Sequence, residues 1–381
     1  MKLEFIDSIL TEVAAAPART PHPEDAIFDG SSAAASMLQA LEWVVANPGS
    51  ATIKWDGMPA LVFGRMPDGG FVLTDVAGFT AKGYDGLFRS PRQAIKLLAQ
   101  RDADAKAQGK PAGRVEALGP MYQKLFPMLQ AAVPENFKGF IQGDLLYTTT
   151  PPEVAGAYVF KPNYVEYKIP ASSNLGQAIG ASEVGIAAHT YYKDPASNPE
   201  PIHHITLKKI SGLLVIEPTV KDIKNVSPNN KLVKELRSVV HQNGSAIDQL
   251  FNPADLRAAQ VTDLPALCKK YVNSRITTNY DNLLADFGPW LQRTVTPSKY
   301  NNIVEYLQSP RSNLDGMSAA FTSFLLLHEI KTDMLEQLDR QQPGQEGWVI
   351  ASDAGRAKLV NRFGFSAGNR ILNNPNLASP T

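Results

Sequence analysis

The spacing of apolar residues changes twice along the chain, and these changes constrain the fold more than any other sequence feature. Residues 51–217 are mixed and rich in short strand-like runs, whereas roughly 120 residues after Pro218 carry apolar side chains at helical spacing. Strand-like runs return beyond Pro343-Gly344, at 348–351 and 358–360. A helical block with strands on both sides predicts an insertion into a sheet-containing domain.

The same periodicity predicts the individual elements. We expect strands where short β-rich runs lie between turn residues, at 51–54, 60–65, 71–76, 139–148, 158–161, 165–169, 184–192 and 212–217. We expect helices where apolar residues recur every three or four positions, at 3–13, 37–45, 91–106, 120–132, 231–242, 263–274, 280–293, 298–307 and 317–340. The prediction is an α+β fold in which residues 1–217 and 342–381 form one domain and residues 218–341 form an all-helical module.

Composition and charge exclude several classes of protein. With 381 residues, 44% of them hydrophobic, the chain can bury a substantial core. Lys plus Arg and Asp plus Glu both number 37, so the chain lacks the net positive charge of a strongly basic nucleic-acid-binding protein. No run reaches the roughly 20 apolar residues of a membrane helix, and Met1–Asp7 mixes charges into its apolar positions, unlike a secretory signal.

The single cysteine, Cys268, rules out an intramolecular disulfide and a cysteine-rich zinc site. One unpaired cysteine is typical of proteins in a reducing compartment. We therefore expect a monomeric cytoplasmic protein without a membrane segment, whose phosphate-binding surface, if it has one, is local.

Four segments carry residues that suit nucleotide chemistry. Lys54-Trp55-Asp56-Gly57 ends the strand 51–54 at a tight turn, and Gly143-Asp144 lies within the apolar strand 139–148. Glu346-Gly347 precedes the strand 348–351, and Arg356-Ala357-Lys358 places two basic residues two positions apart. Each segment alone is ordinarily a solvated turn or a surface charge, so their order along the chain is the informative feature.

Taken in that order, the four segments resemble the first, third, fourth and fifth motifs of covalent lysine nucleotidyltransferases, the superfamily of ATP-dependent DNA ligases, RNA ligases and mRNA capping enzymes. The third motif departs from the usual pattern, because Asp144 stands where glutamate is usual. The resemblance implies a nucleotidyltransferase fold, similar to an ATP-grasp-like ligase catalytic domain, with antiparallel sheets around an ATP cleft. It also implies strand joining through a lysyl-AMP intermediate.

The resemblance assigns the chemical roles position by position. Lys54 becomes the nucleophile, Asp56 and Gly57 shape its turn, and Ile53 lines the nucleotide site. Arg356 and Lys358 contact phosphates or help to expel pyrophosphate. Asp144 and Glu346 hold Mg²⁺ or Mn²⁺ or contact the ribose, because hard carboxylate oxygens suit these cations. The nucleotide substrate is ATP.

Other assignments follow the family pattern more loosely. Pro59 stands where many ligases have an arginine, so Arg65 is a substitute for the ribose or terminal-phosphate contact. Lys82 is a candidate phosphate-binding lysine, although a solvated loop lysine has the same appearance. The strand 184–192 offers His189 or Tyr191 as the platform under adenine, and core packing is the alternative for both.

Substrate recognition departs further from the family. Because the chain ends at Thr381, we expect no oligonucleotide-binding barrel after the basic strand, and the helical module then grips the nucleic acid. Its part 219–275 holds nine Lys or Arg against five Asp or Glu, including Lys221, Lys224, Lys231, Lys234, Arg237, Lys269 and Lys270.

Several alternatives remain open at this point. The sequence favours DNA ends slightly over RNA or mixed strands. A capping-type guanylyltransferase shares the motifs but uses GTP, and a non-catalytic nucleic-acid-binding protein could keep the scaffold without the reaction. The compact build without a barrel also suits a viral protein, which would act in the host cytoplasm.

Overall fold

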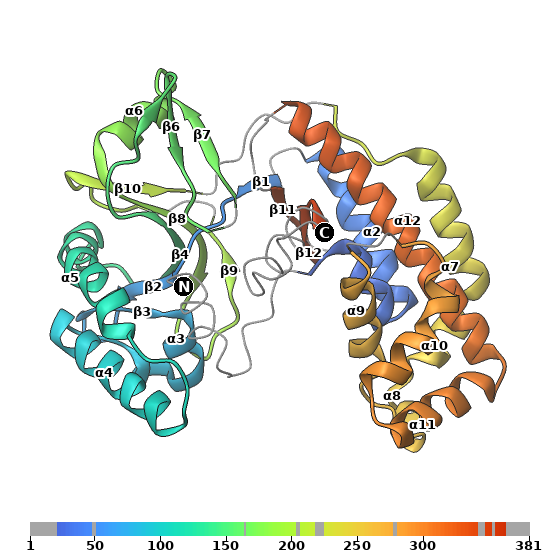
Figure 1. Ribbon diagram of the computed structural model, residues 1–381. Helices are drawn as coiled ribbons and strands as arrows, with labels where there is room; N and C mark the ends of the chain where they lie inside the picture. Colours follow the sequence, from blue (N-terminus) through green and yellow to red (C-terminus); the bar gives the residue numbers. More distant parts are fainter. Residues whose placement is uncertain are drawn as a thin grey trace, which may run out of the picture. The chain divides into compact units, whose positions relative to one another are not determined.

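The computed structural model describes residues 21–47, 51–163, 165–202, 206–217, 225–276, 280–341, 347–352 and 355–362. Contacts between Cα atoms divide the chain into two compact units. The described part of unit 1 lies within residues 54–217, and that of unit 2 lies within 21–53 and 225–362 (Figure 1). Each unit is described separately below.

Unit 1 is built on a six-stranded open sheet with the order β10-β8-β4-β2-β3, in which β9 pairs with β8. Neighbouring strands are antiparallel except β10, which runs parallel to β8. The strands are β2 (Ala60–Arg65), β3 (Phe71–Asp75), β4 (Gly139–Tyr147), β8 (Ser182–Tyr192), β9 (Glu200–Pro201) and β10 (Gly212–Ile216). A second antiparallel sheet contains β5 (Glu153–Val154), β6 (Ala157–Phe160) and β7 (Tyr167–Pro170).

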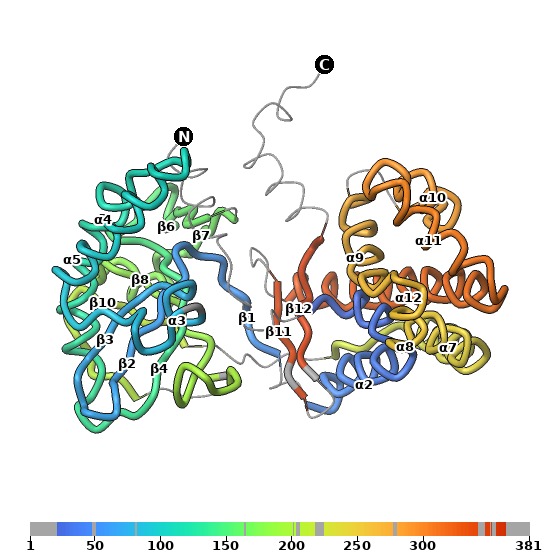
Figure 2. Tube along the Cα trace, turned by 90° about the horizontal axis from the view of Figure 1, so that it is seen from below, coloured from blue at the N-terminus to red at the C-terminus, as the bar shows by residue number. Residues whose placement is uncertain are grey.

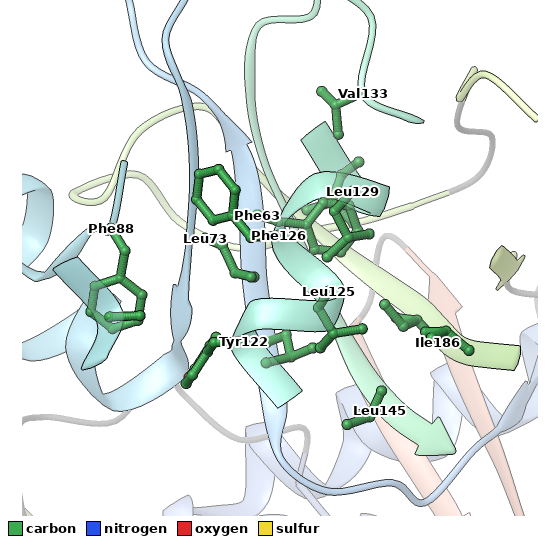
Figure 3. Packing of buried hydrophobic residues seen from close by; sticks show 14 of the residues in the cluster. Phe63, Leu73, Phe88, Tyr122, Leu125, Phe126, Leu129, Val133, Leu145 and Ile186 are labelled. Atoms are coloured by element: carbon green, nitrogen blue, oxygen red, sulfur yellow. The ribbon is translucent and has the colours of Figure 1, made fainter. Parts of the chain in front are cut away.

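Helices α4 (Pro91–Ala107) and α5 (Arg114–Ala132) cover one face of the six-stranded sheet. Figure 3 shows the buried cluster between these helices and the sheet, where Phe126 and Leu129 of α5 lie beside Phe63 of β2. Full burial of a side chain of this size contributes about 1.5–3 kcal/mol. This packing explains why one face of these strands is apolar and buried, with Leu61 and Phe63 of β2, Leu73 of β3, Ile141 of β4 and Ile186 of β8 among its members.

The second face of the sheet is covered at one end by α3 (Val76–Lys82), which leads into η3 (Gly83–Gly86). Phe79 of α3 packs edge-on against Phe140 and Tyr192, with ring centroids 5.2 and 5.0 Å apart. Polar side chains of β4 and β8, among them Gln142, Asp144 and His189, also lie on this face. The remaining helix of this unit, α6 (Asn174–Gly180), packs against β8 and the small sheet.

Unit 2 combines helices with a small sheet. The described helices are η1 (Pro23–Asp29), α2 (Ser31–Ala46), α7 (Asn230–Leu250), α8 (Pro253–Ala258), α9 (Leu264–Ser274), α10 (Leu283–Thr294), α11 (Pro297–Gln308) and α12 (Ser312–Gln341). Helices α7 and α12 approach so closely that a Cβ on Gly316 would lie 2.4 Å from the Ala246 carbonyl oxygen. Strands β1 (Ala51–Lys54), β11 (Gly347–Ser352) and β12 (Gly355–Val360) form a sheet in the order β1-β11-β12 (Figure 2).

A buried ion cluster ties distant segments of unit 2 together. Glu24 of η1 is fully buried and contacts Lys331 Nζ at 2.5 Å and Arg362 Nη1 at 3.0 Å. Arg362 also contacts Asp25 at 2.8 Å. Burial opposes the charge of Glu24, but Lys331, His328 and Arg362 together hold the pKa of this carboxyl well below its usual range. The cluster therefore connects η1, α12 and the residues after β12.

The predicted α+β class is confirmed, but three details of the prediction differ from the structure. The larger sheet is mixed rather than antiparallel, because β10 is parallel to β8. The described residues of 225–341 are helical as expected, but they do not form a unit of their own, since residues 21–53 and 347–362 belong to the same compact unit and supply its sheet. Residues 76–82 are a helix instead of a strand end and a loop, because the Asp75 carboxylate accepts the N–H of Gly78 and caps the helix.

The expected helix 3–13 lies outside the described residues. Within the described ranges, none of the helices combines the length and the apolar composition that crossing a membrane requires.

Candidate functional site

The Lys54 loop, which we define as residues 54–58, begins at the last residue of β1. In β1 the side chains of Ala51 and Ile53 are buried, whereas Thr52 and Lys54 are partly exposed. By the two-residue period of a strand, Lys54 lies on the same side of β1 as Thr52. Ile53 was expected to line the nucleotide site, but its side chain is only 7% exposed and belongs to the packing of β1.

Asp56 is held on both its backbone and its side chain. Its N–H donates to the Tyr167 hydroxyl oxygen at 2.6 Å, and its carboxylate accepts the side-chain amide of Asn163 at 3.1 Å. The Asp56 residue is 6% exposed, and Trp55 beside it packs on the Tyr167 ring with centroids 4.9 Å apart. The loop after Lys54 is therefore fixed by Tyr167 of β7 and by Asn163 in the loop that joins β6 to β7.

Gly57 brings the Lys54 loop into direct contact with β4. A Cβ on Gly57 would lie 2.5 Å from the Leu145 carbonyl oxygen and 3.0 Å from Asp144 Cβ, so glycine is needed for this close approach. The Met58 N–H donates to the Leu145 carbonyl at 2.9 Å. Two segments far apart in sequence, the Lys54 loop and Asp144-Leu145, thus become neighbours.

Asp144 lies on the polar part of the second sheet face. Its carboxylate is 3.6 Å from His189 Nε2, and the other ring nitrogen of His189 is 2.8 Å from the Thr190 hydroxyl. The Asp144 side chain is 19% exposed, so its oxygens remain accessible to a ligand. Asp144 and His189, both predicted from the sequence, are brought together here.

Of the two carboxylates predicted to bind Mg²⁺, Asp144 is the one that lies within the described residues. Mg²⁺ commonly takes one or two carboxylates and completes its shell with phosphate oxygens and water. Asp144 supplies one such carboxylate, and the described residues contain no group of three or more metal-ligating side chains. The second predicted ligand, Glu346, lies outside the described residues.

Arg356 and Lys358 alternate with buried residues on β12. Ala357 and Leu359 are fully buried, whereas Arg356 and Lys358 are partly exposed. The strand period therefore places both basic side chains on one face of β12, as the sequence predicted. The Lys358 N–H also donates to the Pro21 carbonyl at 3.0 Å.

Two predicted nucleotide contacts have other roles in the structure. The Arg65 guanidinium donates to the backbone carbonyls of Gly69, Val133 and Pro134, at 2.7–2.9 Å. Arg65 also stands five residues along β2 from Ala60, the partner of Asp144, a separation of about 16 Å in a strand. The guanidinium of Arg65 thus serves loop carbonyls in the structure, and its expected ribose or phosphate contact stays a prediction.

The ring of Tyr191 packs against the core cluster under α5, which is the alternative that the sequence left open, and its hydroxyl donates to the Lys138 carbonyl at 2.9 Å. This leaves His189 as the predicted platform residue on the polar face. Lys82 is exposed and ends α3 instead of lying in a loop. It therefore belongs to the helix that covers the other end of the same sheet face.

Part of the basic surface of the helical module is neutralised. Arg237 pairs with Glu42 at 2.8 Å, and Lys269 pairs with Asp29 at 2.6 Å. Lys231 and Lys234 are exposed on α7, and Lys270 is exposed on α9. Lys221 and Lys224 lie outside the described residues. The local positive charge is thus smaller than the count of basic residues indicates.

Sequence reasoning missed Asn163 and Tyr167, the two residues that hold Asp56. They lie more than 100 positions from Asp56, and the strand 165–169 was predicted only from its apolar pattern. A Pro-Asn pair before a strand is an ordinary turn signal. Nothing local distinguishes these residues from other turn and core residues.

Comparison with known proteins gives one match. The sequence model of a family described as "Family of unknown function (DUF6267)" matches residues 20–76 and 114–373, a range that includes Lys54, Asp144, Tyr167 and Lys358. Neither a curated protein nor a solved structure matches the chain. Since the matched residues make up well over half of the sequence, the chain belongs to the DUF6267 family.

Proposed function

We propose that this protein is an ATP-dependent polynucleotide ligase that joins 5′-phosphate and 3′-hydroxyl ends through a lysyl-AMP intermediate on Lys54. The observation that supports this function best is the packing of the Lys54 loop on Asp144-Leu145. If Lys54-Trp55-Asp56-Gly57 matched the first motif only by chance, it would have no reason to lie beside the segment that matches the third motif. Under this proposal the unit 1 sheet is a nucleotidyltransferase fold, with Asp144 and His189 on its nucleotide-binding face.

The first step is an exchange of bonds at the α-phosphorus of ATP. The neutral amine of Lys54 attacks this phosphorus, the new N–P bond forms, and the bond to pyrophosphate breaks. The proton released by the amine passes to solvent. Because the loop is fixed at Asp56 and Gly57, the amine is presented from an ordered backbone, which favours an in-line approach.

Charge on the phosphates must be neutralised for this attack. Asp144 is the described residue that would hold Mg²⁺, and the bound ion would neutralise phosphate charge and polarise the α-phosphate. The motif resemblance assigns Arg356 and Lys358 to phosphate oxygens, and the two basic side chains share one face of β12. Neither the Mg²⁺ contact of Asp144 nor the phosphate contacts of the two basic residues require a metal site built from protein ligands alone.

The second and third steps require a nucleic acid. AMP moves from Lys54 to a 5′-phosphate end, and a 3′-hydroxyl then displaces AMP and seals the strand. The exposed Lys231 and Lys234 of α7 are the residues of unit 2 that we assign to backbone phosphates. DNA ends are slightly favoured over RNA or mixed ends.

A strand-joining panel tests this function. Nicked duplexes that carry DNA or RNA on each side of the break are incubated with the protein, Mg²⁺ and either ATP or GTP. We expect sealed product with ATP on at least one substrate, preceded by a strand that carries AMP on its 5′-phosphate. Reactions without nucleotide are the control.

The other outcomes of the panel contradict the proposal in different ways. Label transferred only from GTP indicates a capping-type guanylyltransferase. Binding to the nucleic acids without adduct or sealed product indicates a non-catalytic binding protein.

A further inference from the structure

We propose that Tyr167 and Asn163 are positioning residues that set the direction in which Lys54 points. This inference rests on the proposed function of Lys54 and extends it to residues that carry none of the nucleotidyltransferase motifs. Neither side chain is assigned a contact with substrate. They act through Asp56, two residues after the nucleophile.

Tyr167 holds the backbone of the Lys54 loop. Its hydroxyl oxygen accepts the Asp56 N–H at 2.6 Å, and its side chain is fully buried. The ring is packed between Trp55, at 4.9 Å, and Phe160 of β6, at 5.4 Å in a stacked arrangement. Since the ring cannot turn away without breaking this packing, the hydroxyl is a fixed acceptor for the loop.

Asn163 holds the side chain of the same residue. Its amide donates to Asp56 Oδ1 at 3.1 Å, and Asp56 is almost completely buried. A buried carboxylate without hydrogen-bond donors is strongly disfavoured, so this contact keeps the Asp56 side chain inside the protein. Tyr167 and Asn163 therefore fix Asp56 at two different points.

These contacts act together with β4. On one side, the Met58 N–H donates to the Leu145 carbonyl, and Gly57 approaches the same carbonyl closely. On the other side, Asp56 is held by β7 of the small sheet and by the loop that joins β6 to β7. Because a misplacement of about 1 Å can slow a reaction about 100-fold, a loop fixed from both sides is what in-line attack by its lysine requires.

The test is Tyr167→Phe, which keeps the ring and removes the acceptor of the Asp56 N–H. We expect the rate of lysyl-AMP formation at saturating ATP to fall at least about 10-fold, because the nucleophile is misdirected. The ATP concentration that gives half the maximal rate is expected to change less than about twofold, since no substrate contact is lost. Asn163→Ala is expected to show the same pattern and serves as a second variant if Tyr167→Phe does not fold.

Tyr158→Phe is the matched control. Tyr158 lies on β6 of the same small sheet, and its hydroxyl lies close to Gly180 of α6. This variant is expected to form lysyl-AMP at the wild-type rate. Hydrogen exchange of the peptide that contains residues 54–58 is the second readout, and it should become faster in Tyr167→Phe but not in Tyr158→Phe.

The outcomes separate this inference from the proposed function. A wild-type rate in folded Tyr167→Phe and Asn163→Ala overturns the positioning role while the function of Lys54 stands. A parallel change in maximal rate and half-saturating ATP also overturns it, because that pattern indicates a general loss of structure or binding. Absence of lysyl-AMP in the wild-type protein overturns both proposals.

Discussion

Replacing Lys54 with alanine is expected to reduce transfer of labelled AMP to the protein to less than about one-thousandth of the wild-type level, because the attacking amine is gone. Lys54→Arg should lose the reaction to the same extent. A guanidinium keeps the positive charge but stays protonated, so it cannot act as a nucleophile. The measurement is protein-bound radioactivity after incubation with α-labelled ATP and Mg²⁺.

Lys96→Ala is the control for this experiment. Lys96 is exposed on α4, which covers the opposite face of the sheet from Asp144. Its replacement is expected to leave labelling unchanged. Labelling of Lys54→Ala at the wild-type level would assign the nucleophile to another residue.

Replacing Glu24 with glutamine is expected to lower the free energy of unfolding of unit 2 by about 3 kcal/mol at neutral pH. The change removes the carboxylate that Lys331 contacts at 2.5 Å, and Lys331 is only 1% exposed. The buried ammonium then lacks its counter-charge. Denaturant unfolding followed by tryptophan fluorescence is a suitable measurement, because Trp43, Trp290 and Trp348 all belong to unit 2.

The double variant Glu24→Gln, Lys331→Met is the matched control. It removes both charges, so most of the lost stability should return. The pH dependence gives a further check. The pKa of Glu24 is lowered in the folded protein, so its stabilising contribution is fully present above the ordinary value of about 4.5 and declines as pH falls below it.

The expected result is that wild-type protein and Glu24→Gln differ in stability at neutral pH and become more alike in strong acid. An unfolding free energy of Glu24→Gln equal to that of the wild type at neutral pH would contradict the stabilising role of the buried cluster.

Most elements could be predicted because their signals are local. The helix 317–340 and the strand 139–148 follow directly from apolar spacing, and the structure gives α12 as Ser312–Gln341 and β4 as Gly139–Tyr147. The helix α3 was missed because its start depends on a cap by Asp75 rather than on periodicity. Its short length left too few turns for a helical pattern.

Long-range arrangement was harder to predict. The sequence paired the strands after Pro343 with the first domain, whereas the buried contacts of Glu24 with Lys331 and Arg362 join residues after β12 to the helical unit. Arg65 was a candidate for the ribose or phosphate contact because it follows Lys54 closely in the sequence. That closeness does not reveal the loop carbonyls to which its guanidinium donates. Side-chain partners far apart in sequence leave no local pattern.

Intact-mass measurement of the wild-type protein after incubation with ATP and Mg²⁺ tests the central claim most directly. We predict a species heavier by one adenylyl group, and fragmentation of its peptides should place that group on Lys54. An unmodified mass under these conditions, or an adenylyl group on another residue, would contradict the account.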